Sequence, residues 1–187
     1  MEKVMIGKKM VGAAPVVIAG AIVDGKANYI TLGGFGGLSL TPPIVYITLA
    51  KAHYTNTGIK DNGYFSVNVP SSDLVQKTDY VGLVSGRDID KSDVFTPFFG
   101  SVDKAPMIRE CHVNMLCKVI DQIDLPNNDV FLGEILEVYV SGDCLTDGKP
   151  DVKKINPLIL AGGLYCELGN VVGTAYRDGK SYSHHFK

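Results

Sequence analysis

Residues 111–123 read Cys-His-Val-Asn-Met-Leu-Cys-Lys-Val-Ile-Asp-Gln-Ile, and this stretch is the clearest strand pattern in the chain. Its odd positions are apolar except for Asp121, and its even positions are mostly polar, which is typical of a half-buried antiparallel strand. Residues 126–129, Pro-Asn-Asn-Asp, predict a turn. Residues 130–141 then predict the returning strand of a long hairpin. Because both faces of this second strand are largely apolar, we expect it to be buried on both sides.

Shorter apolar runs rich in Val, Ile and Tyr lie between frequent turn signals. They predict further strands at residues 16–23, 28–32, 44–49 and 65–69. Two short helices are expected: one follows a capping signal at Ser71-Ser72-Asp73 and reaches about residue 84, and the other covers residues 55–60. Long hairpins with few helices predict a closed or partly split antiparallel barrel.

The glycine-rich run at residues 33–37 has neither the strand–helix context of a Rossmann fingerprint nor the spacing of a P-loop. We interpret it as a flexible loop that could pass over a cofactor.

The composition is that of an ordinary globular protein, with 187 residues, 45% hydrophobic and 20% charged residues, and a net charge of −2. This length predicts one domain over residues 1–187. The weak charge argues against general nucleic-acid binding, which needs a basic surface. No apolar run reaches the ~20 residues of a membrane helix, and the layout of a signal peptide is missing. We therefore expect no membrane contact and a cytoplasmic location.

The sequence offers no pattern of a metal or hydrolytic site. Its four cysteines form no Cys-x-x-Cys pair, so we expect buried free thiols and no zinc or iron–sulfur centre. The adjacent His184 and His185 lie near the C-terminus, where a frayed tail is the simpler interpretation. Glu134 and Glu137 fall on opposite faces of a strand, which excludes a paired-carboxylate arrangement.

Six segments carry a resemblance through their order along the chain. They are residues 28–31 (Asn-Tyr-Ile-Thr), 41–45 (Thr-Pro-Pro-Ile-Val), 53–59 (His-Tyr-Thr-Asn-Thr-Gly-Ile), 63–70 (Gly-Tyr-Phe-Ser-Val-Asn-Val-Pro), 84–91 (Val-Ser-Gly-Arg-Asp-Ile-Asp-Lys) and 161–169 (Ala-Gly-Gly-Leu-Tyr-Cys-Glu-Leu-Gly). In this order they resemble the flavin reductase-like family, specifically its flavoredoxin branch. The resemblance implies a mainly β fold: an antiparallel split β-barrel of Greek-key type, with a few short helices, that usually dimerises. It also implies FMN binding and electron transfer.

The resemblance assigns candidate cofactor-binding residues to four parts of the chain: the segment near the flavin ring and ribityl chain, the phosphate segment, a polar loop, and one tyrosine beside the ring or a dimer interface. They are Asn28, Tyr29, Ile30, Thr31, Thr48, Leu49, Ala50, Lys51, His53, Thr55, Ser85, Gly86, Arg87, Lys91 and Tyr165. No side chain is expected to act as a catalytic acid or base, because the cofactor carries the redox chemistry.

The phosphate segment departs from the family pattern. Many relatives carry arginines near the positions of Ala50 and His53, so Lys51 or Arg87 would have to replace their charge. We expect Lys51, His53 and Thr55 to lie near the phosphate, with backbone amides at a helix start favouring the anion. From the residues alone, a surface lysine, a capping threonine and a solvated turn at 85–88 stay open as alternatives, as does a core position for Tyr165.

Three functions follow from the resemblance. The first is an NAD(P)H-dependent flavin reductase, which would take a nicotinamide nucleotide as electron donor. The second is a flavoredoxin-type carrier that holds FMN tightly and exchanges electrons with a redox partner protein. The third is a flavin-free split-barrel dimer that acts as a binding or structural module. In each case we expect a homodimer.

Overall fold

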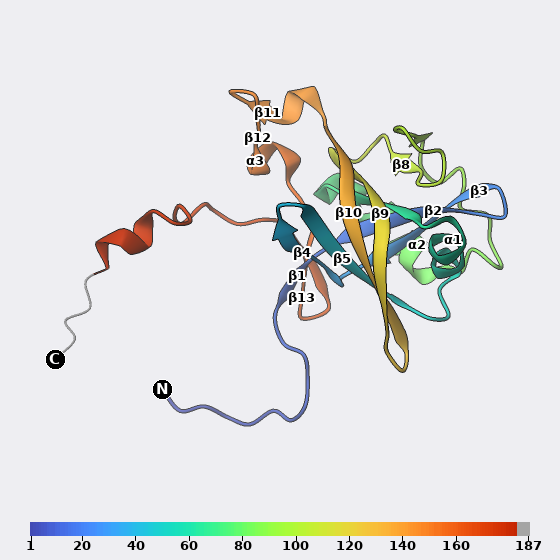
Figure 1. The fold of residues 1–187 in the computed structure, drawn as a ribbon. Helices are drawn as coiled ribbons and strands as arrows, with labels where there is room; N and C mark the ends of the chain where they lie inside the picture. The colour runs from blue at the N-terminus through green and yellow to red at the C-terminus, as the bar shows by residue number, and fades with distance from the viewer. Residues whose placement is uncertain (183–187) are drawn as a thin grey trace.

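A seven-stranded antiparallel sheet curls into a barrel in the computed structural model, which describes residues 1–182 (Figure 1). The strand order is β3-β2-β6-β9-β10-β5-β4. In that order the strands span Lys26–Leu32, Val17–Val23, Tyr64–Val69, Val113–Asp124, Asn128–Val140, Pro43–Ala50 and Phe35–Leu40. Strand β2 pairs with β6, and β10 pairs with β5, so some neighbours in the sheet are far apart in the sequence. The prediction of a mainly β, antiparallel split barrel with few helices is confirmed.

Smaller elements surround this barrel. A second sheet joins β1 (Ala13–Pro15), β13 (Ile159–Ala161) and β14 (Leu164–Cys166). Two-residue strands form the pairs β7 (Pro97–Phe98) with β8 (Met107–Ile108) and β11 (Leu145–Thr146) with β12 (Lys149–Pro150). The helices are α1 (Tyr54–Asn62), α2 (Val75–Leu83) and α3 (Val152–Ile155), and the 3₁₀ turns are η1 (Ser72–Leu74), η2 (Gly142–Cys144) and η3 (Asp178–Ser181).

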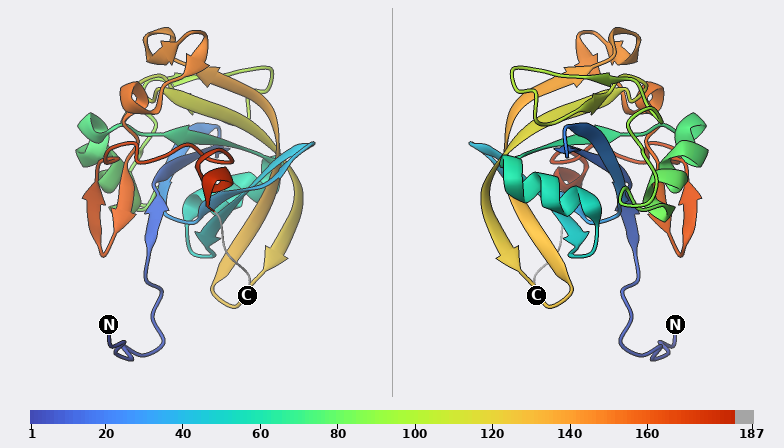
Figure 2. Two further views of the ribbon diagram at one scale, coloured as in Figure 1. Left: turned by 90° about the vertical axis from the view of Figure 1, so that its left-hand side faces the viewer. Right: turned by 90° about the vertical axis from the view of Figure 1, so that its right-hand side faces the viewer.

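The main core lies inside the curled sheet. Alternating residues of β2, β3 and β5 meet there, together with Phe65, Phe131 and Ile59. Helix α1 packs directly on β2, since a Cβ added at Gly58 would lie 2.3 Å from the carbonyl oxygen of Ile22. A second core cluster on the outer face of β2 and β3 packs against α2. Figure 2 shows α2 beside the β13–β14 hairpin, on the side of the barrel away from the tip of the β9–β10 hairpin.

The predicted hairpin is present as β9 and β10, but the expectation that its second strand is buried on both sides is wrong. Val138 and Tyr139 are 55% and 39% exposed. The pairing of β9 with β10 shifts register at Leu136, which reverses the inward face of the strand beyond it. On β9, Leu116 on the predicted polar face is buried as well, because residues 97–108 cover it.

The glycine-rich run is only in part a loop, because Gly33 and Gly34 form the turn after β3 and the residues that follow belong to a strand. Residues from Phe35 onward form β4 and pair with β5. A Cβ at Gly36 would lie 2.7 Å from the Tyr46 ring, and one at Gly34 would lie 2.9 Å from Cβ of Thr48. The side chains of β5 therefore cover the bare backbone of the neighbouring strand, and glycine is needed for that close approach.

Both predicted helices form. Helix α1 ends at Gly63, which has φ 72° and donates its N–H to Ile59 O at 2.9 Å. The capping signal at 71–73 opens η1 before α2, but Ser71 Oγ donates to the Asp73 carboxylate and caps no backbone amide. The histidine pair at 184–185 lies outside the described residues. Within the described part, none of the helices has the length and apolar character to cross a membrane.

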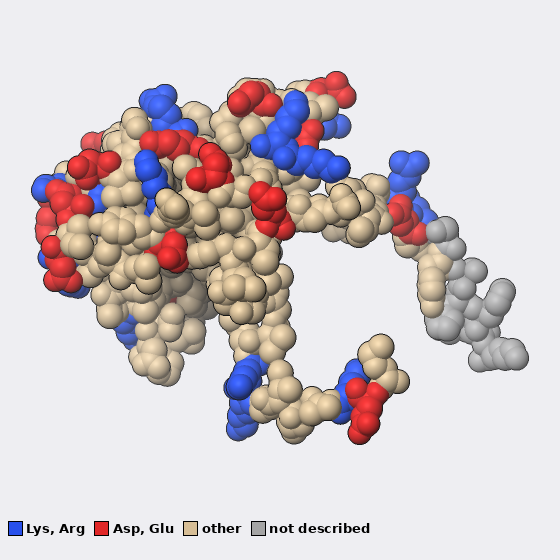
Figure 3. Space-filling model, turned by 180° about the vertical axis from the view of Figure 1, so that it is seen from behind, with Lys and Arg blue, Asp and Glu red and all other residues tan. Residues whose placement is uncertain are grey.

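Both ends of the chain extend away from the barrel as arms (Figure 1). The N-terminal arm is residues 1–12, and the C-terminal arm is residues 167–182. In Figure 3 acidic and basic side chains lie on the arms as well as on the body, with stretches of uncharged surface between them. The arms expose apolar side chains, namely Val4, Met5, Ile6, Met10, Val11, Leu168, Val171, Val172, Tyr176 and Tyr182.

Candidate functional site

Two neighbouring hollows lie at the C-terminal end of α2, and both are lined by Gly82 and Leu83. We call the one lined by His53, Thr55 and Lys91 the His53 hollow, the other the Tyr165 hollow, and the two together the α2 groove. Their volumes are about 170 and 220 Å³. Together they fall in the range of small-molecule sites, which is roughly 300–1,000 Å³.

The His53 hollow is built by the start of α1 and the loop that follows α2. His53 is the residue before α1, and Thr55 lies in its first turn. Ser85 and Gly86 come from the loop after α2, and Lys91 closes the hollow from the end of that loop. Together with Ile30 of β3, six of the predicted site residues therefore meet here, although they come from three separate parts of the sequence.

Lys91 is buried without a carboxylate partner among the described residues. Its residue is only 3% exposed, and its ammonium group donates to Tyr29 O at 3.0 Å and to Val81 O at 2.8 Å. Burial lowers the pKa of this group to about 8. A buried ammonium held only by carbonyl dipoles leaves the hollow with a positive potential that a bound anion would offset.

His53 adds an unused polar group to the same hollow. Its Nδ1 is buried and has no hydrogen-bond partner. Burial and the nearby charge of Lys91 both lower the pKa of His53, in that order, so the ring is neutral at pH 7. The Thr55 hydroxyl accepts a hydrogen bond of 2.7 Å from Asn28 Nδ2, which leaves its own proton free to be donated into the hollow.

Gly86 must be glycine for this wall to form. A Cβ at that position would lie 2.2 Å from Asn28 Oδ1 and 2.8 Å from the Tyr54 ring. The backbone of the loop therefore lies directly on β3 and α1. Ser85 Oγ accepts from the Arg87 N–H at 3.2 Å, which fixes the turn that presents this backbone to the hollow.

The Tyr165 hollow is wider and more apolar. Thr31, Leu32 and Gly33 at the end of β3 form one wall, and Leu160 and Tyr165 of the β13–β14 hairpin form the other. The Tyr165 hydroxyl donates to Asp79 of α2 at 2.9 Å, and burial together with this carboxylate raises the pKa of Tyr165 to about 12. The hairpin is thus fixed to α2 across a slot that is open to solvent at Leu83, which is 76% exposed.

Strand alternation directs several predicted residues away from the groove. The Tyr29 side chain is fully buried on the opposite face of β3 against Phe95, and burial raises its pKa; only its carbonyl reaches the site, through Lys91. Ile30 lies between the core and the His53 hollow. Leu49 is core, so Thr48 points to the outer face of β5.

Lys51 and Ala50 also stay outside the groove. The backbone N–H of Lys51 donates to Asn127 O at 3.0 Å, which directs the residue toward the tip of the β9–β10 hairpin. There its ammonium group pairs with the exposed Asp124 carboxylate. The carbonyl of Ala50 accepts from the His53 N–H at 3.0 Å, so this residue shapes the turn before α1 and does not line either hollow.

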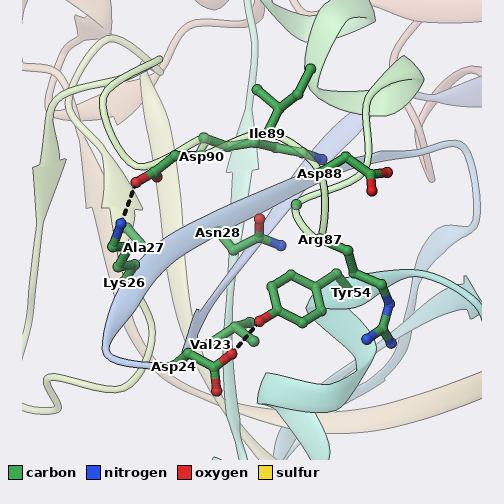
Figure 4. Close-up of a pocket in the computed structure, with 12 residues that line it drawn as sticks. Val23, Asp24, Lys26, Ala27, Asn28, Tyr54, Arg87, Asp88, Ile89 and Asp90 are labelled. Atoms are coloured by element: carbon green, nitrogen blue, oxygen red, sulfur yellow. Dashed lines mark hydrogen bonds and ion pairs between the residues drawn. The ribbon is translucent and has the colours of Figure 1, made fainter.

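A third pocket of about 260 Å³ adjoins the His53 hollow, with Tyr54, Gly86 and Lys91 common to both. Figure 4 shows the Tyr54 ring between Asp24, whose carboxylate accepts its hydroxyl hydrogen bond, and Arg87. The guanidinium of Arg87 lies 4.8 Å from the centre of that ring. Arg87 is therefore exposed at the rim of this pocket and does not line the His53 hollow itself.

Sequence reasoning missed the residues that join the two hollows. Gly82 and Leu83 end α2, and a Cβ at Gly82 would lie 3.1 Å from Thr31 Cβ. The Thr31 hydroxyl on β3 donates to the carbonyl oxygen of Thr78 in α2. The only signal in the sequence was the glycine itself, since glycine inside a predicted helix often marks a close packing contact.

Comparisons with known proteins identify the family of the chain. Residues 11–169 match the family model described as flavin reductase like domain. The structure is similar to flavoredoxin from Methanosarcina acetivorans, with 43% identity, a TM-score of 0.93, and 97% of this chain and 99% of that chain covered. It is also similar to flavoredoxin of Desulfovibrio vulgaris (Miyazaki F), with 32% identity, a TM-score of 0.88 and 96% and 100% coverage.

A more distant solved structure shares the fold. It is an FMN-binding protein from Thermus thermophilus with 18% identity and a TM-score of 0.78, and the match covers 93% of this chain and 97% of that one. The family match spans most of the sequence, and it includes every residue of the α2 groove. This chain belongs to the flavin reductase-like family.

Proposed function

We propose that the chain binds FMN in the α2 groove and acts as an NAD(P)H-dependent flavin reductase. The phosphate would occupy the His53 hollow and the isoalloxazine ring the Tyr165 hollow. The observation that carries this proposal is Lys91, a buried ammonium with two carbonyl partners and no carboxylate among the described residues. Burying a charge without a counterion is costly, and a phosphate dianion would supply that counterion.

The other groups of the His53 hollow fit a phosphate. Neutral His53 can donate from one ring nitrogen, and the Thr55 hydroxyl can donate a second hydrogen bond. Helix α1 has nine residues, and its N-terminal amides add a favourable partial charge. Gly86 lets the loop backbone approach closely. Lys51 has no part in this proposal because it pairs with Asp124.

The Tyr165 hollow fits a flat ring with polar edges. Leu32 and Leu160 provide apolar contact, while Thr31 and the backbone at Gly33 provide polar atoms at the rim. The Tyr165–Asp79 hydrogen bond holds the β13–β14 hairpin against α2 and so fixes the width of the slot. Bound FMN would accept a hydride from a nicotinamide and pass the electrons on. The residues of the groove would orient the reactants and exclude water.

A flavoredoxin-type electron carrier is the second candidate. It is favoured by the 43% identity and nearly complete coverage of the match to a flavoredoxin. Such a carrier would hold FMN in the same groove and exchange electrons with a redox partner protein. The open side of the slot at Leu83 and Leu164, which are 76% and 68% exposed, would admit either a nicotinamide or a partner surface.

We also propose a homodimer that covers this open side. Apolar side chains are exposed on both arms, at the groove rim and on the outer part of β10. Exposed apolar surface of this extent marks an interaction site, and a second copy offers the matching surface. A stable dimer would bury on the order of 2,000 Å². Sedimentation at micromolar concentration should give the dimer mass, and a monomer that keeps FMN would contradict this proposal.

Flavin titration tests the function. Flavin-free protein should bind FMN, and FMN at about 100 times its dissociation constant should stabilise the fold by about 2.7 kcal/mol. FAD should bind equally well or more weakly. Anaerobic addition of NADH or NADPH should then bleach the bound flavin. Rapid bleaching supports the reductase, and slow bleaching combined with tight FMN binding supports the carrier. A melting temperature indifferent to FMN would contradict both.

A further inference from the structure

A second cluster of reactive side chains lies where β9 begins and β10 ends. His112 directly precedes β9, and Asp143 and Cys144 belong to η2, the turn that follows β10. A ring nitrogen, a carboxylate oxygen and a thiol sulfur from these three residues all lie within 4.8 Å of one another. None of the three lines the α2 groove. The proposed function therefore leaves this cluster unexplained.

The backbone around the cluster is fixed by hydrogen bonds. The Ser141 N–H donates to His112 O at 2.9 Å, and the Cys144 N–H donates to Ser141 O at 2.9 Å. The Asp151 N–H donates to Cys144 O at 2.8 Å and connects the turn to α3. The three side chains thus start from well-defined positions, which lowers the ordering cost of holding a common ligand.

The side chains themselves are only weakly engaged. His112 Nδ1 lies 3.3 Å from Ser141 Oγ, and Cys144 Sγ lies 3.6 Å from Lys154 O. Of the three residues Cys144 is buried, His112 is partly buried and Asp143 is exposed, so the cluster opens to solvent on its Asp143 side.

We propose that His112, Asp143 and Cys144 bind a divalent cation of the zinc type, with water as the fourth ligand. Nitrogen, oxygen and thiolate sulfur are the ligands that zinc takes, and in a tetrahedral site these atoms lie roughly 3.3–3.8 Å apart. The cluster reaches that spacing with side-chain movements on the order of 1 Å from its present limit of 4.8 Å. Binding forms a metal–sulfur bond and releases the thiol proton to water.

The position of the cluster assigns the ion a structural role. It would join the residue that starts β9 to the turn that ends β10, at the end of the hairpin opposite its tip. Sequence spacing gave no hint of this site, because His112 and the Asp143–Cys144 pair lie far apart in the chain and the cysteines form no Cys-x-x-Cys motif.

Cobalt(II) substitution tests the site directly, with difference spectra to remove the flavin contribution. The full chain should bind one Co²⁺ and show a thiolate-to-cobalt charge-transfer band, and Zn²⁺ should displace it. Cys144→Ser should abolish the band. Cys166→Ser, which removes the exposed thiol on β14, is the matched control and should keep it. His112→Gln and Asp143→Asn should each weaken zinc binding at least about tenfold, as loss of a direct ligand costs no less than loss of a supporting contact.

Three results would overturn the proposal. One is a parent protein with no charge-transfer band, and another is a band that survives Cys144→Ser. The third is a band lost when His184 and His185 are both replaced by alanine. Should Cys144→Ser fail to fold, the other two ligand variants decide: parental zinc affinity in both rejects the site, and a loss in both supports it. The far-ultraviolet circular dichroism spectrum reports whether each variant is folded.

Discussion

The His53 hollow and the tip of the β9–β10 hairpin each hold a lysine that the sequence predicted to bind the cofactor, and the two lysines differ in their surroundings. Lys91 in the hollow is 3% exposed and has only carbonyl partners. Lys51 at the tip is exposed and already paired with Asp124. A buried cation without a counterion indicates a missing anion, whereas a satisfied surface pair indicates none. The burial of each lysine and the groups that it contacts therefore distinguish Lys91 from Lys51, which the sequence motifs did not.

The largest effect is expected at Asp129, which connects the hairpin to α1. Its buried carboxylate accepts from Asn56 and Gln122 at 2.7 and 2.8 Å and pairs with Lys60 at 2.7 Å. Hydrogen bonds to a charged group contribute about 1.5–3 kcal/mol each, so Asp129→Asn should cost roughly 3 kcal/mol or more in urea unfolding. Asp124→Asn, on the exposed pair with Lys51, should cost less than about 1 kcal/mol.

Lowering the pH should remove the stabilisation that the Asp129 carboxylate contributes to the fold. Burial opposes ionisation of Asp129, but the contacts with Lys60, Asn56 and Gln122 outweigh it and hold its pKa below the usual value. The stabilisation is therefore complete above the unfolded-state pKa and is lost as the pH falls through the folded-state value. If Asp129→Asn and Asp124→Asn were equally stable at pH 7, the difference expected between the buried and the exposed contact would be contradicted.

Gly86→Ala should damage the His53 hollow specifically. The added Cβ would displace Asn28, which now donates to Thr55. Forcing extra atoms into a packed wall costs about 1–3 kcal/mol. We expect FMN affinity to fall by about ten- to a hundredfold. Gly25→Ala is a control for a glycine with open space around it, although its φ of 76° adds strain, and it should leave FMN affinity unchanged. Equal losses in both variants would contradict the close approach at Gly86.

The pH dependence of FMN affinity should follow Lys91. In the free protein its pKa is about 8, and a bound phosphate would raise that value. FMN affinity should therefore be constant with respect to this group below pH 8 and fall by up to about tenfold per pH unit above it. Riboflavin, which lacks the phosphate, should show no such fall. The flavin-free protein should instead gain stability above pH 8, because the unfolded lysine then binds more protons than the folded one.

The smallest effect is expected in the Tyr165 hollow. Tyr165→Phe removes the hydrogen bond to Asp79 while keeping the ring. A bond to a charged group contributes about 1.5–3 kcal/mol to the fold, but the Tyr165 hydroxyl is turned to Asp79 and acts on the flavin only through the position of the hairpin, so flavin affinity should fall less than in Gly86→Ala. FMN and riboflavin should weaken together, because only the ring slot is changed. Isothermal titration of both ligands checks this, and a loss confined to FMN would mean that the two hollows are assigned the wrong way round.

Most strands of the barrel could be predicted from the sequence, because period-2 alternation and turn residues mark long strands directly. It missed β4, where glycines gave no alternation and the covering side chains of Tyr46 and Thr48 lie on another strand. It could not reveal the strands of two or three residues, since such elements are too short to show a period. Register shifts were equally hidden, and the one at Leu136 exposed a face of β10 that the pattern predicted to be buried.

The sequence predicted which segments form the candidate site, but it did not separate the residues that line the hollow from their neighbours that point elsewhere. The ordered segments contained Ile30, His53, Thr55, Ser85, Gly86 and Lys91, and the fold brings these six together. Alternation along β3 and β5 could have separated Tyr29 and Thr48 from them in advance. The direction of Lys51 depends on a backbone hydrogen bond to Asn127, which no local pattern encodes.

Titration of flavin-free Lys91→Met and Lys51→Met with FMN and with riboflavin determines whether the His53 hollow holds the phosphate. We expect Lys91→Met to weaken FMN binding by about ten- to a hundredfold, since a charge-assisted contact contributes roughly 1.5–3 kcal/mol. Riboflavin affinity should stay at the parental value, and Lys51→Met should change neither ligand. Parental FMN affinity in Lys91→Met, or an equal loss for riboflavin, would contradict the assignment of the phosphate to the His53 hollow.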